Sequence, residues 1–149
     1  MADSFPLSLA EIQPSQLFIS TAKLARLLAT WGPPHIEALP PVPVKHLDGR
    51  IVATDGHTRA FAAYRRGFSE VPVYWDEDDL DWEAYRICVD WCLAEGIRTV
   101  TDLEGRLLAP EDYDVLWLGR CRAMHEMLAL RRRGVPPFQL PPFWGGPGC

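Results

Sequence analysis

Hydrophobic residues recur at helical spacing in some segments of the chain and at alternate or consecutive positions in others. Behind Ser20, a good N-cap, apolar residues stand at i, i+3, i+4 and i+7. This spacing predicts a helix over residues 21–31, and Gly32-Pro33-Pro34 ends it. The apolar stripe consists of Leu24, Leu27, Leu28 and Trp31.

Extended segments lie on both sides of this helix. Asp48-Gly49 is typical of a two-residue hairpin turn, because glycine tolerates positive φ. Pro43 lacks an N–H, so we expect it on a sheet edge or at a strand start. The predicted strands are 5–12, a run that begins at Val42, Arg50 to Thr54, and Val71 to Trp75.

The second half of the chain predicts helices. Asp81 caps a segment that continues to about Glu95, and a short helix starts at Thr99 or Thr101. Pro110 is a good first residue for a last helix that ends near Arg133. We interpret its apolar stripe as core packing; the stripe is Tyr113, Trp117, Cys121, Met124 and Leu128.

The segment between the predicted strand at 50–54 and the next helix is the main candidate for chemistry. It reads Asp55-Gly56-His57-Thr58-Arg59-Ala60, and a small-residue helical pattern follows as far as Gly67. Free N–H groups at a helix start attract anions, and an arginine fork suits phosphate. We therefore expect Gly56, His57, Thr58 and Arg59 to bind phosphate, with Asp55 as a base or Mg²⁺ ligand. The open alternative is ordinary turn chemistry at Asp55-Gly56, with His57 as a surface residue and Arg59 as a structural ion-pair partner.

Composition narrows the classes of function. The 149 residues are 48% hydrophobic with a formal charge of -5, and no long basic cluster precedes Arg131, which argues against a DNA-binding protein. No apolar segment is long enough to span a membrane. We see no export signal, so we expect a cytoplasmic protein with reduced cysteines.

Two cysteine-containing pairs raise the possibility of a zinc site. Cys88 and Cys92 are four residues apart on one predicted helix, and Cys121 and His125 are four apart on another. If the helices pack face to face, four ligands could converge in the tetrahedral arrangement that zinc prefers. Buried free cysteine is the stronger alternative, because this spacing differs from that of zinc knuckles.

The order of elements up to residue 75 resembles the N-terminal domain of ParB-like proteins and sulfiredoxin. The resemblance depends on Pro6-Leu7-Ser8-Leu9, Ile12-Gln13-Pro14, Pro43-Val44, Asp48-Gly49, Gly56-His57-Thr58-Arg59, Ala62-Ala63, Gly67 and Val71-Pro72-Val73. It implies an α+β fold, with a small mixed sheet and helices in residues 1–78. From the residues themselves we expect a helical appendage in 79–133 and a disordered or loosely docked Pro/Gly-rich tail in 134–149.

The resemblance also implies activities. Members bind or hydrolyse nucleotides, reduce oxidised peroxiredoxin, or phosphorylate free serine. The members that reduce peroxiredoxin need a cysteine between Gly56 and Arg59. This chain has His57 and Thr58 there, so we do not expect the reductase activity. The serine kinases are similar at the turn, which reads Asp-Gly-His-His-Arg in them, so Asp55 and His57 would be catalytic. The catalytic base of these kinases is a glutamate soon after the first strand, where this chain has Pro14-Ser15-Gln16. The resemblance therefore favours nucleotide binding over phosphorylation of serine.

Two hypotheses follow. In the first, the chain binds a nucleotide or phosphorylated small molecule with Mg²⁺ at Asp55, and acts as a phosphotransferase or nucleotide hydrolase if it is an enzyme. In the second, it is a non-catalytic module whose aromatic helical half binds a protein partner. Exposed Trp82, Trp91 and Trp117 would favour the second hypothesis.

Overall fold

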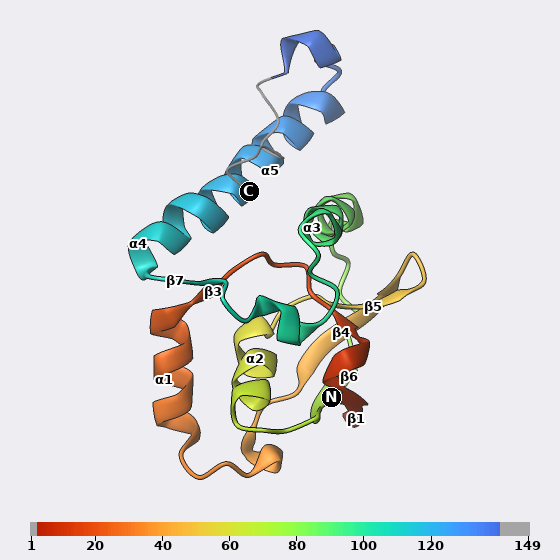
Figure 1. Cartoon of the computed structure of the whole chain (residues 1–149). Helices are drawn as coiled ribbons and strands as arrows, with labels where there is room; N and C mark the ends of the chain where they lie inside the picture. The colour runs from red at the N-terminus through yellow and green to blue at the C-terminus, as the bar shows by residue number, and fades with distance from the viewer. Residues whose placement is uncertain (1–2, 141–149) are drawn as a thin grey trace.

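The computed structural model describes residues 3–140 and shows a mixed α+β fold (Figure 1). A five-stranded sheet has the order β1-β6-β4-β5-β2, and a second, two-stranded sheet joins β3 to β7. The strands are β1 (Phe5–Ser8), β2 (Ile12–Gln13), β3 (Ile19–Ser20), β4 (Val42–Leu47), β5 (Arg50–Ala53), β6 (Glu70–Trp75) and β7 (Leu107–Leu108).

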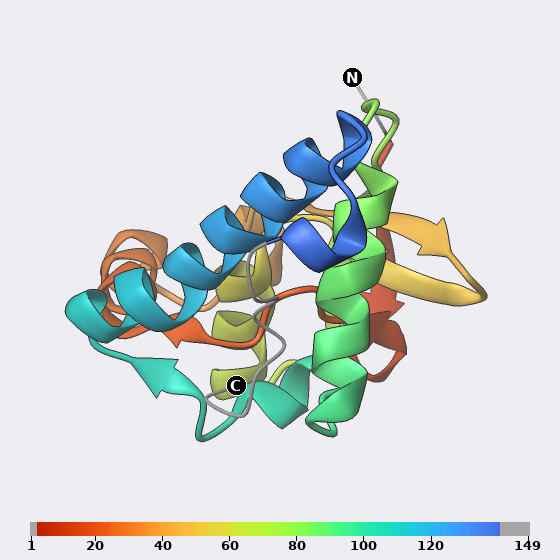
Figure 2. The same cartoon turned by 90° about the horizontal axis from the view of Figure 1, so that it is seen from above.

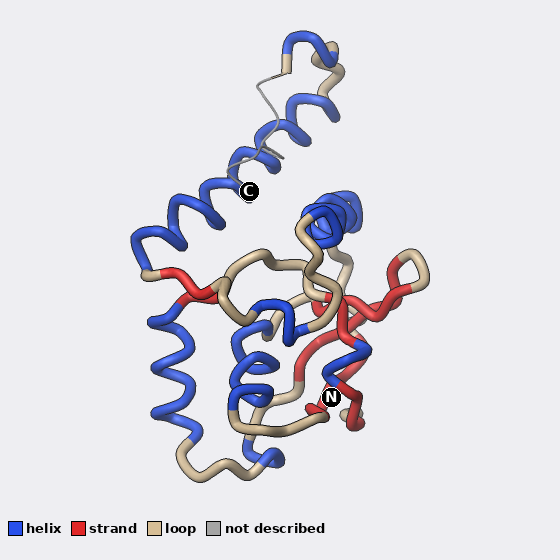
Figure 3. Tube along the Cα trace, viewed as in Figure 1, coloured by secondary structure: helices blue, strands red, loops and turns tan. Residues whose placement is uncertain are grey.

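Five α-helices and five shorter helical segments connect and cover these strands, as the coloured tube of Figure 3 shows. The α-helices are α1 (Thr21–Trp31), α2 (His57–Arg65), α3 (Trp82–Ala94), α4 (Pro110–Tyr113) and α5 (Gly119–Arg132). The shorter segments are η1 (Leu9–Glu11), η2 (Ile36–Ala38), η3 (Val100–Leu103), η4 (Asp114–Leu118) and η5 (Pro137–Gln139).

The strands pair in both directions. β1 and β6 are antiparallel, with Phe5 opposite Val73, and β6 is parallel to β4. β4 and β5 form the predicted hairpin, in which Asp48 and Gly49 have φ of 51° and 80°. Positive φ at both positions gives the type I′ geometry that matches the strand twist.

The helices pack on one another and on the sheet. α1 and α2 lie side by side (Figure 1), and α2 also packs on β4 and β6. α3 packs against the β4–β5 hairpin through Val89, which joins Leu47 and Val52 in a small apolar cluster. Seen from above, α5 and α3 lie on either side of α2 (Figure 2).

Several predicted features are confirmed. Ser20 caps α1 through its side chain, and Asp81 caps α3 in the same way. The aromatic stripe of the last helix is mostly buried, since Tyr113, Trp117 and Met124 are each at most 6% exposed. The hydrophobic spacing therefore identified both the helices and the faces that they bury.

Pro43 lies at the start of β4, as one of the two predicted placements had it, although β4 is a central strand. Three details differ from the predictions. The expected strand over 5–12 is divided into β1, the turn η1 and β2, because Ser8 caps η1 through its side chain. β3 and β7 were not predicted, since two-residue strands have no periodicity. The last helix contains a π-helical segment, η4, between α4 and α5.

One buried cluster crosses the predicted boundary at residue 78. It includes Ile12 and Phe61 from the first part and Cys92, Leu103 and Leu128 from the second. β3 pairs in parallel with β7, and the Gln13 side-chain amide donates to the Ile97 carbonyl at 2.9 Å. The division at 78 stays a prediction. Of the predicted tail, residues 134–140 contain η5, and 141–149 lie outside the described residues.

Candidate functional site

The predicted glycine turn forms at the start of α2. Gly56 is left-handed (φ 73°, ψ 20°) and acts as the N-cap of the helix, and no side chain caps the first turn. Asp55 is exposed and its Oδ1 accepts a hydrogen bond from the Gly56 N–H at 2.8 Å. The strand–turn–helix prediction is therefore confirmed, and the start of α2 offers amide groups to whatever lies in front of it.

His57 is the most tightly enclosed polar residue of the turn. It is 4% exposed, and its Nε2 accepts a hydrogen bond from the backbone N–H of Ser15 at 2.9 Å. An N–H can only donate, so Nε2 carries a lone pair and the neutral ring holds its proton on Nδ1. Within residues 3–140, that Nδ1 has no hydrogen-bond partner. The turn thus contains one buried, unused donor.

Burial also fixes the protonation state of His57. Desolvation of the ring lowers its pKa from 6.5 to about 4. The nearby carboxylate of Asp55 raises the pKa, and the charge of Arg59 lowers it, but both effects are smaller than that of burial. His57 is therefore neutral near pH 7, and it can act there as a hydrogen-bond donor but not as a cation.

Arg59 turns away from His57. Its Nη1 donates to the backbone carbonyls of Pro41 (2.8 Å) and Pro40 (3.3 Å), which lie in the segment before β4. The guanidinium also crosses Gly56 so closely that a Cβ there would stand 2.8 Å from Arg59 Nη2. Arg59 therefore ties a loop to the helix through carbonyl groups, and within residues 3–140 it does not form the ion pair that the open alternative expected.

A cavity of about 280 Å³ opens beside Asp55 and His57. Its other walls come from the loop after β2, from α3 and from the η4–α5 helix, and the start of α2 points toward these elements in Figure 1. None of its described lining residues is Lys or Arg. The lining is Ser15, Gln16, Thr54, Asp55, His57, Asp81, Ala84, Tyr85, Cys88, Trp117, Cys121, Met124 and His125.

The predicted phosphate-binding residues divide between two places. Asp55 and His57 line the cavity, whereas the lining includes neither Gly56, nor Thr58, nor Arg59. Thr58 is half-buried at the start of α2. The structure thus brings only part of the motif to the cavity.

Several cavity residues were not expected in the site. The Tyr85 hydroxyl donates to the Thr54 carbonyl at 2.8 Å, and burial raises the pKa of Tyr85 to about 12. The Gln16 amide donates to the Tyr113 hydroxyl at 3.1 Å, and burial raises the pKa of Tyr113 to about 12. The sequence signal for Gln16 was its position in Pro14-Ser15-Gln16, the segment in which the predicted resemblance would place a glutamate.

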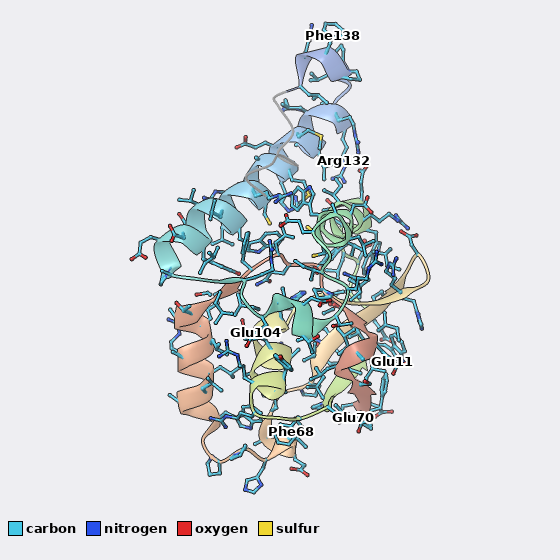
Figure 4. All side chains as sticks on the ribbon, viewed as in Figure 1. Glu11, Phe68, Glu70, Glu104, Arg132 and Phe138 are labelled. Carbon is cyan, nitrogen blue, oxygen red and sulfur yellow. The ribbon has the colours of Figure 1, made fainter. Side chains whose placement is uncertain are left out.

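The acidic segment 76–81 has mainly structural roles. Asp76 is 7% exposed, and its carboxylate accepts from the Thr54 hydroxyl at 2.6 Å and from the Asp78 N–H at 2.9 Å. Asp81 caps α3 and pairs with Arg132, and this hydrogen bond lowers the pKa of Asp81. Figure 4 shows Arg132 near the end of α5, next to α3. Of the two carboxylates in the cavity lining, Asp81 forms an ion pair, whereas Asp55 forms none among residues 3–140.

The candidate zinc ligands come together only in part. Cys88, Cys121 and His125 line the cavity together. Cys92 is fully buried elsewhere, and desolvation raises its pKa to about 12. Among residues 3–140, no group of three or more His, Cys, Asp or Glu side chains is placed to hold a metal ion.

A larger hollow of about 470 Å³ lies away from this motif. It is bounded by β1, η2 and the start of β6, and Phe68 and Glu70 mark it in Figure 4. Its lining is mainly apolar and includes Phe5, Ile36 and Leu39. It has few polar groups that could take part in a reaction, so the smaller cavity is the better candidate.

Comparisons with known proteins add little. No family model matches the chain, and no curated protein matches it. A solved structure, that of the protein Atu1540 from Agrobacterium tumefaciens, is similar over 90% of this chain and 70% of that one. The identity is 14% and the TM-score is 0.48. Separately, none of the helices within residues 3–140 has the length and apolar character needed to cross a bilayer.

Proposed function

We propose that the cavity beside Asp55 and His57 binds a phosphorylated small molecule or a nucleotide as its Mg²⁺ complex, on a fold of the ParB/sulfiredoxin type. The observation that carries the proposal is the Nδ1–H of His57, which is buried and unused beside an uncapped helix start. A neutral donor and free amides together favour an anion without adding a counter-charge.

The charges of the lining require a cation to accompany the ligand. No described lining residue is Lys or Arg, and Asp55 contributes a negative charge. A phosphate in the cavity therefore needs Mg²⁺, which is bound by carboxylate and phosphate oxygens together. Asp55 is the residue that would hold the ion, because Asp81 already pairs with Arg132.

The size of the cavity favours the phosphate end of a ligand. About 280 Å³ is near the lower limit of ligand pockets, which hold roughly 300–1,000 Å³. Pyrophosphate, or the phosphates of a nucleotide with its base outside, would fit this space. If the protein is a phosphotransferase or hydrolase, catalysis depends on positioning and charge neutralisation, with Asp55 and His57 at the reacting group.

The test is calorimetric titration of the full chain with pyrophosphate, ATP, ADP and CTP, each with and without Mg²⁺. We expect binding that requires Mg²⁺ and that Asp55→Asn weakens at least tenfold. Asp79→Asn is the matched control, because Asp79 is an exposed carboxylate outside the cavity lining. Failure of all four ligands to bind, or equal loss in both variants, would overturn the proposal.

A second variant tests the contribution of the His57 Nδ1–H to binding while the hydrogen bond from Ser15 is kept. His57→Gln keeps an acceptor for the Ser15 N–H and removes the Nδ1–H. A hydrogen bond to a charged group contributes about 1.5–3 kcal/mol, so we expect binding roughly 10- to 100-fold weaker. Unchanged affinity in a folded His57→Gln protein would show that the ligand does not use this donor.

Partner binding by the helical half remains the second proposal, on a different surface. Trp91 and Trp117 are each 6% exposed and Trp82 is half-buried, so the expected tryptophan patch is absent from the described surface. The exposed apolar residues are instead Val115, Leu116 and Leu118 of η4, with Phe138 at the far end of the chain in Figure 4. Sedimentation of the wild type and of Val115→Asp over a concentration series tests whether a second copy binds there.

A further inference from the structure

Two thiols that the proposed function does not use lie together at the cavity wall. Cys88 belongs to α3 and Cys121 to α5, and both are free cysteines that line the cavity. The two thiols interact, since the pKa of Cys88 is raised and that of Cys121 is lowered by the other side chain. Cys121 is half-buried and Cys88 is 8% exposed, so Cys121 is the thiol that a solute in the cavity meets first.

Contacts on both sides of Cys88 and Cys121 fix how α3 and α5 are aligned. On one side, Trp91 of α3 meets Trp117 edge to face at a centroid distance of 6.2 Å. On the other side, Arg131 and Arg132 of α5 pair with Glu83, next to the start of α3. This antiparallel alignment places Cys88 opposite Cys121, which is the arrangement that a disulfide between the two helices requires.

We propose that Cys88 and Cys121 form a reversible dithiol–disulfide site that a hydroperoxide oxidises through the cavity. Cys121 Sγ attacks the peroxide, an S–O bond forms as the O–O bond breaks, and one water or alcohol leaves with the thiol proton. Cys88 Sγ then attacks the sulfenic sulfur, an S–S bond forms, and the S–O bond breaks to release water. Two thiols lose two electrons and two protons, and one peroxide accepts them.

The proposal is tested on the full chain with hydrogen peroxide as the oxidant. Oxidised and reduced samples are compared by intact mass and by mapping of unreduced peptides. We expect the loss of two hydrogen atoms, a Cys88–Cys121 cross-linked peptide, and full reversal by dithiothreitol. Because the cross-link joins two helices, the melting temperature should rise on the order of 5–15 °C.

Cysteine-to-serine variants show which two thiols form the cross-link. Cys149→Ser removes the remaining thiol outside the described residues, and Cys92→Ser removes a thiol that does not line the cavity. Both should still form the cross-link, whereas Cys121→Ser should not. A cross-link through Cys92 or Cys149, or oxygen addition at Cys121 with Cys88 still reduced, would overturn the proposal. The wild-type peptide map needs no substitution, so the test holds even if a variant fails to fold.

Discussion

His57 and Arg59 lie in the same helical turn, yet they serve different parts of the molecule. His57 lines the cavity and keeps an unused donor, whereas Arg59 donates to the carbonyls of Pro40 and Pro41. Residues two apart on a helix point about 200° apart, so they cannot share one small ligand unless the ligand wraps around the helix start. A short motif can therefore combine a binding half and a structural half.

The largest effect that we predict concerns the neutral state of His57. Its pKa is about 4 in the folded protein and 6.5 in an unfolded chain. Above pH 6.5 neither state binds the proton. As the pH falls from 6.5 to 4, the unfolded chain binds it and the folded protein does not, so the free energy of unfolding should fall by about 3 kcal/mol.

Urea unfolding across this pH range measures the loss, with His57→Gln as the comparison, because that variant has no group to titrate at this position. The difference between the two pH profiles isolates His57 from the carboxylates that titrate in the same range. Parallel profiles for wild type and His57→Gln would show that the ring is not buried in its neutral form.

Gly56→Ala tests the close approach of Arg59 to the turn. Alanine must adopt φ of 73° there and meet Arg59 Nη2 at 2.8 Å, so we expect a loss of stability of about 2–3 kcal/mol. Gly67→Ala is the matched control, since its φ is 88° but no atom lies within 4 Å of the new Cβ. It should cost about 1 kcal/mol. Equal losses in chemical denaturation would mean that Arg59 moves aside freely.

Arg59→Ala tests the structural half directly. Two hydrogen bonds to backbone carbonyls are lost at a partly exposed site, so stability should fall by about 1–2 kcal/mol. Arg65→Ala, on the same helix, breaks an exposed ion pair to Glu104 and a cation–π contact with Phe61, and it should cost no more than about 1 kcal/mol. If Arg59→Ala instead abolished ligand binding without changing stability, Arg59 would belong to the binding half.

Thr58→Ala should have the smallest effect. The side chain lies between the two halves, it is half-buried, and within residues 3–140 none of the hydrogen bonds involves it. Stability should change by no more than about 0.5 kcal/mol. A larger loss in urea unfolding, or a clear change in ligand affinity, would place Thr58 in one of the two halves.

The sequence was most informative where a pattern repeats or a cap is chemically distinct. The spacing of Leu24 and Trp31 predicted α1, Asp48-Gly49 predicted the hairpin, and Gly56 predicted the turn before α2. Each of these signals is local. They were enough for the α+β class and for the position of the turn.

The parts that could not be predicted depend on long-range contacts. Nothing local to Ile19 indicates that it pairs with Leu107, and nothing local to Arg59 indicates that the carbonyl of Pro41 lies within reach. The π-helical η4 also left no local signal, although it changes which residues of the last helix face outward. The cavity combines residues from the loops after β2 and β5 with residues from α2, α3, η4 and α5, so its lining appears only once the chain is folded.

The parallel pairing of β3 with β7 has a consequence for synthesis of the protein. Ile19 and Ser20 leave the ribosome long before Leu107 and Leu108 do. Until then the nascent polypeptide has one strand without its partner and apolar side chains exposed to solvent. We expect the chain to acquire protease resistance in one step, only after Leu108 has emerged, and to benefit from chaperones that shield hydrophobic segments until that point.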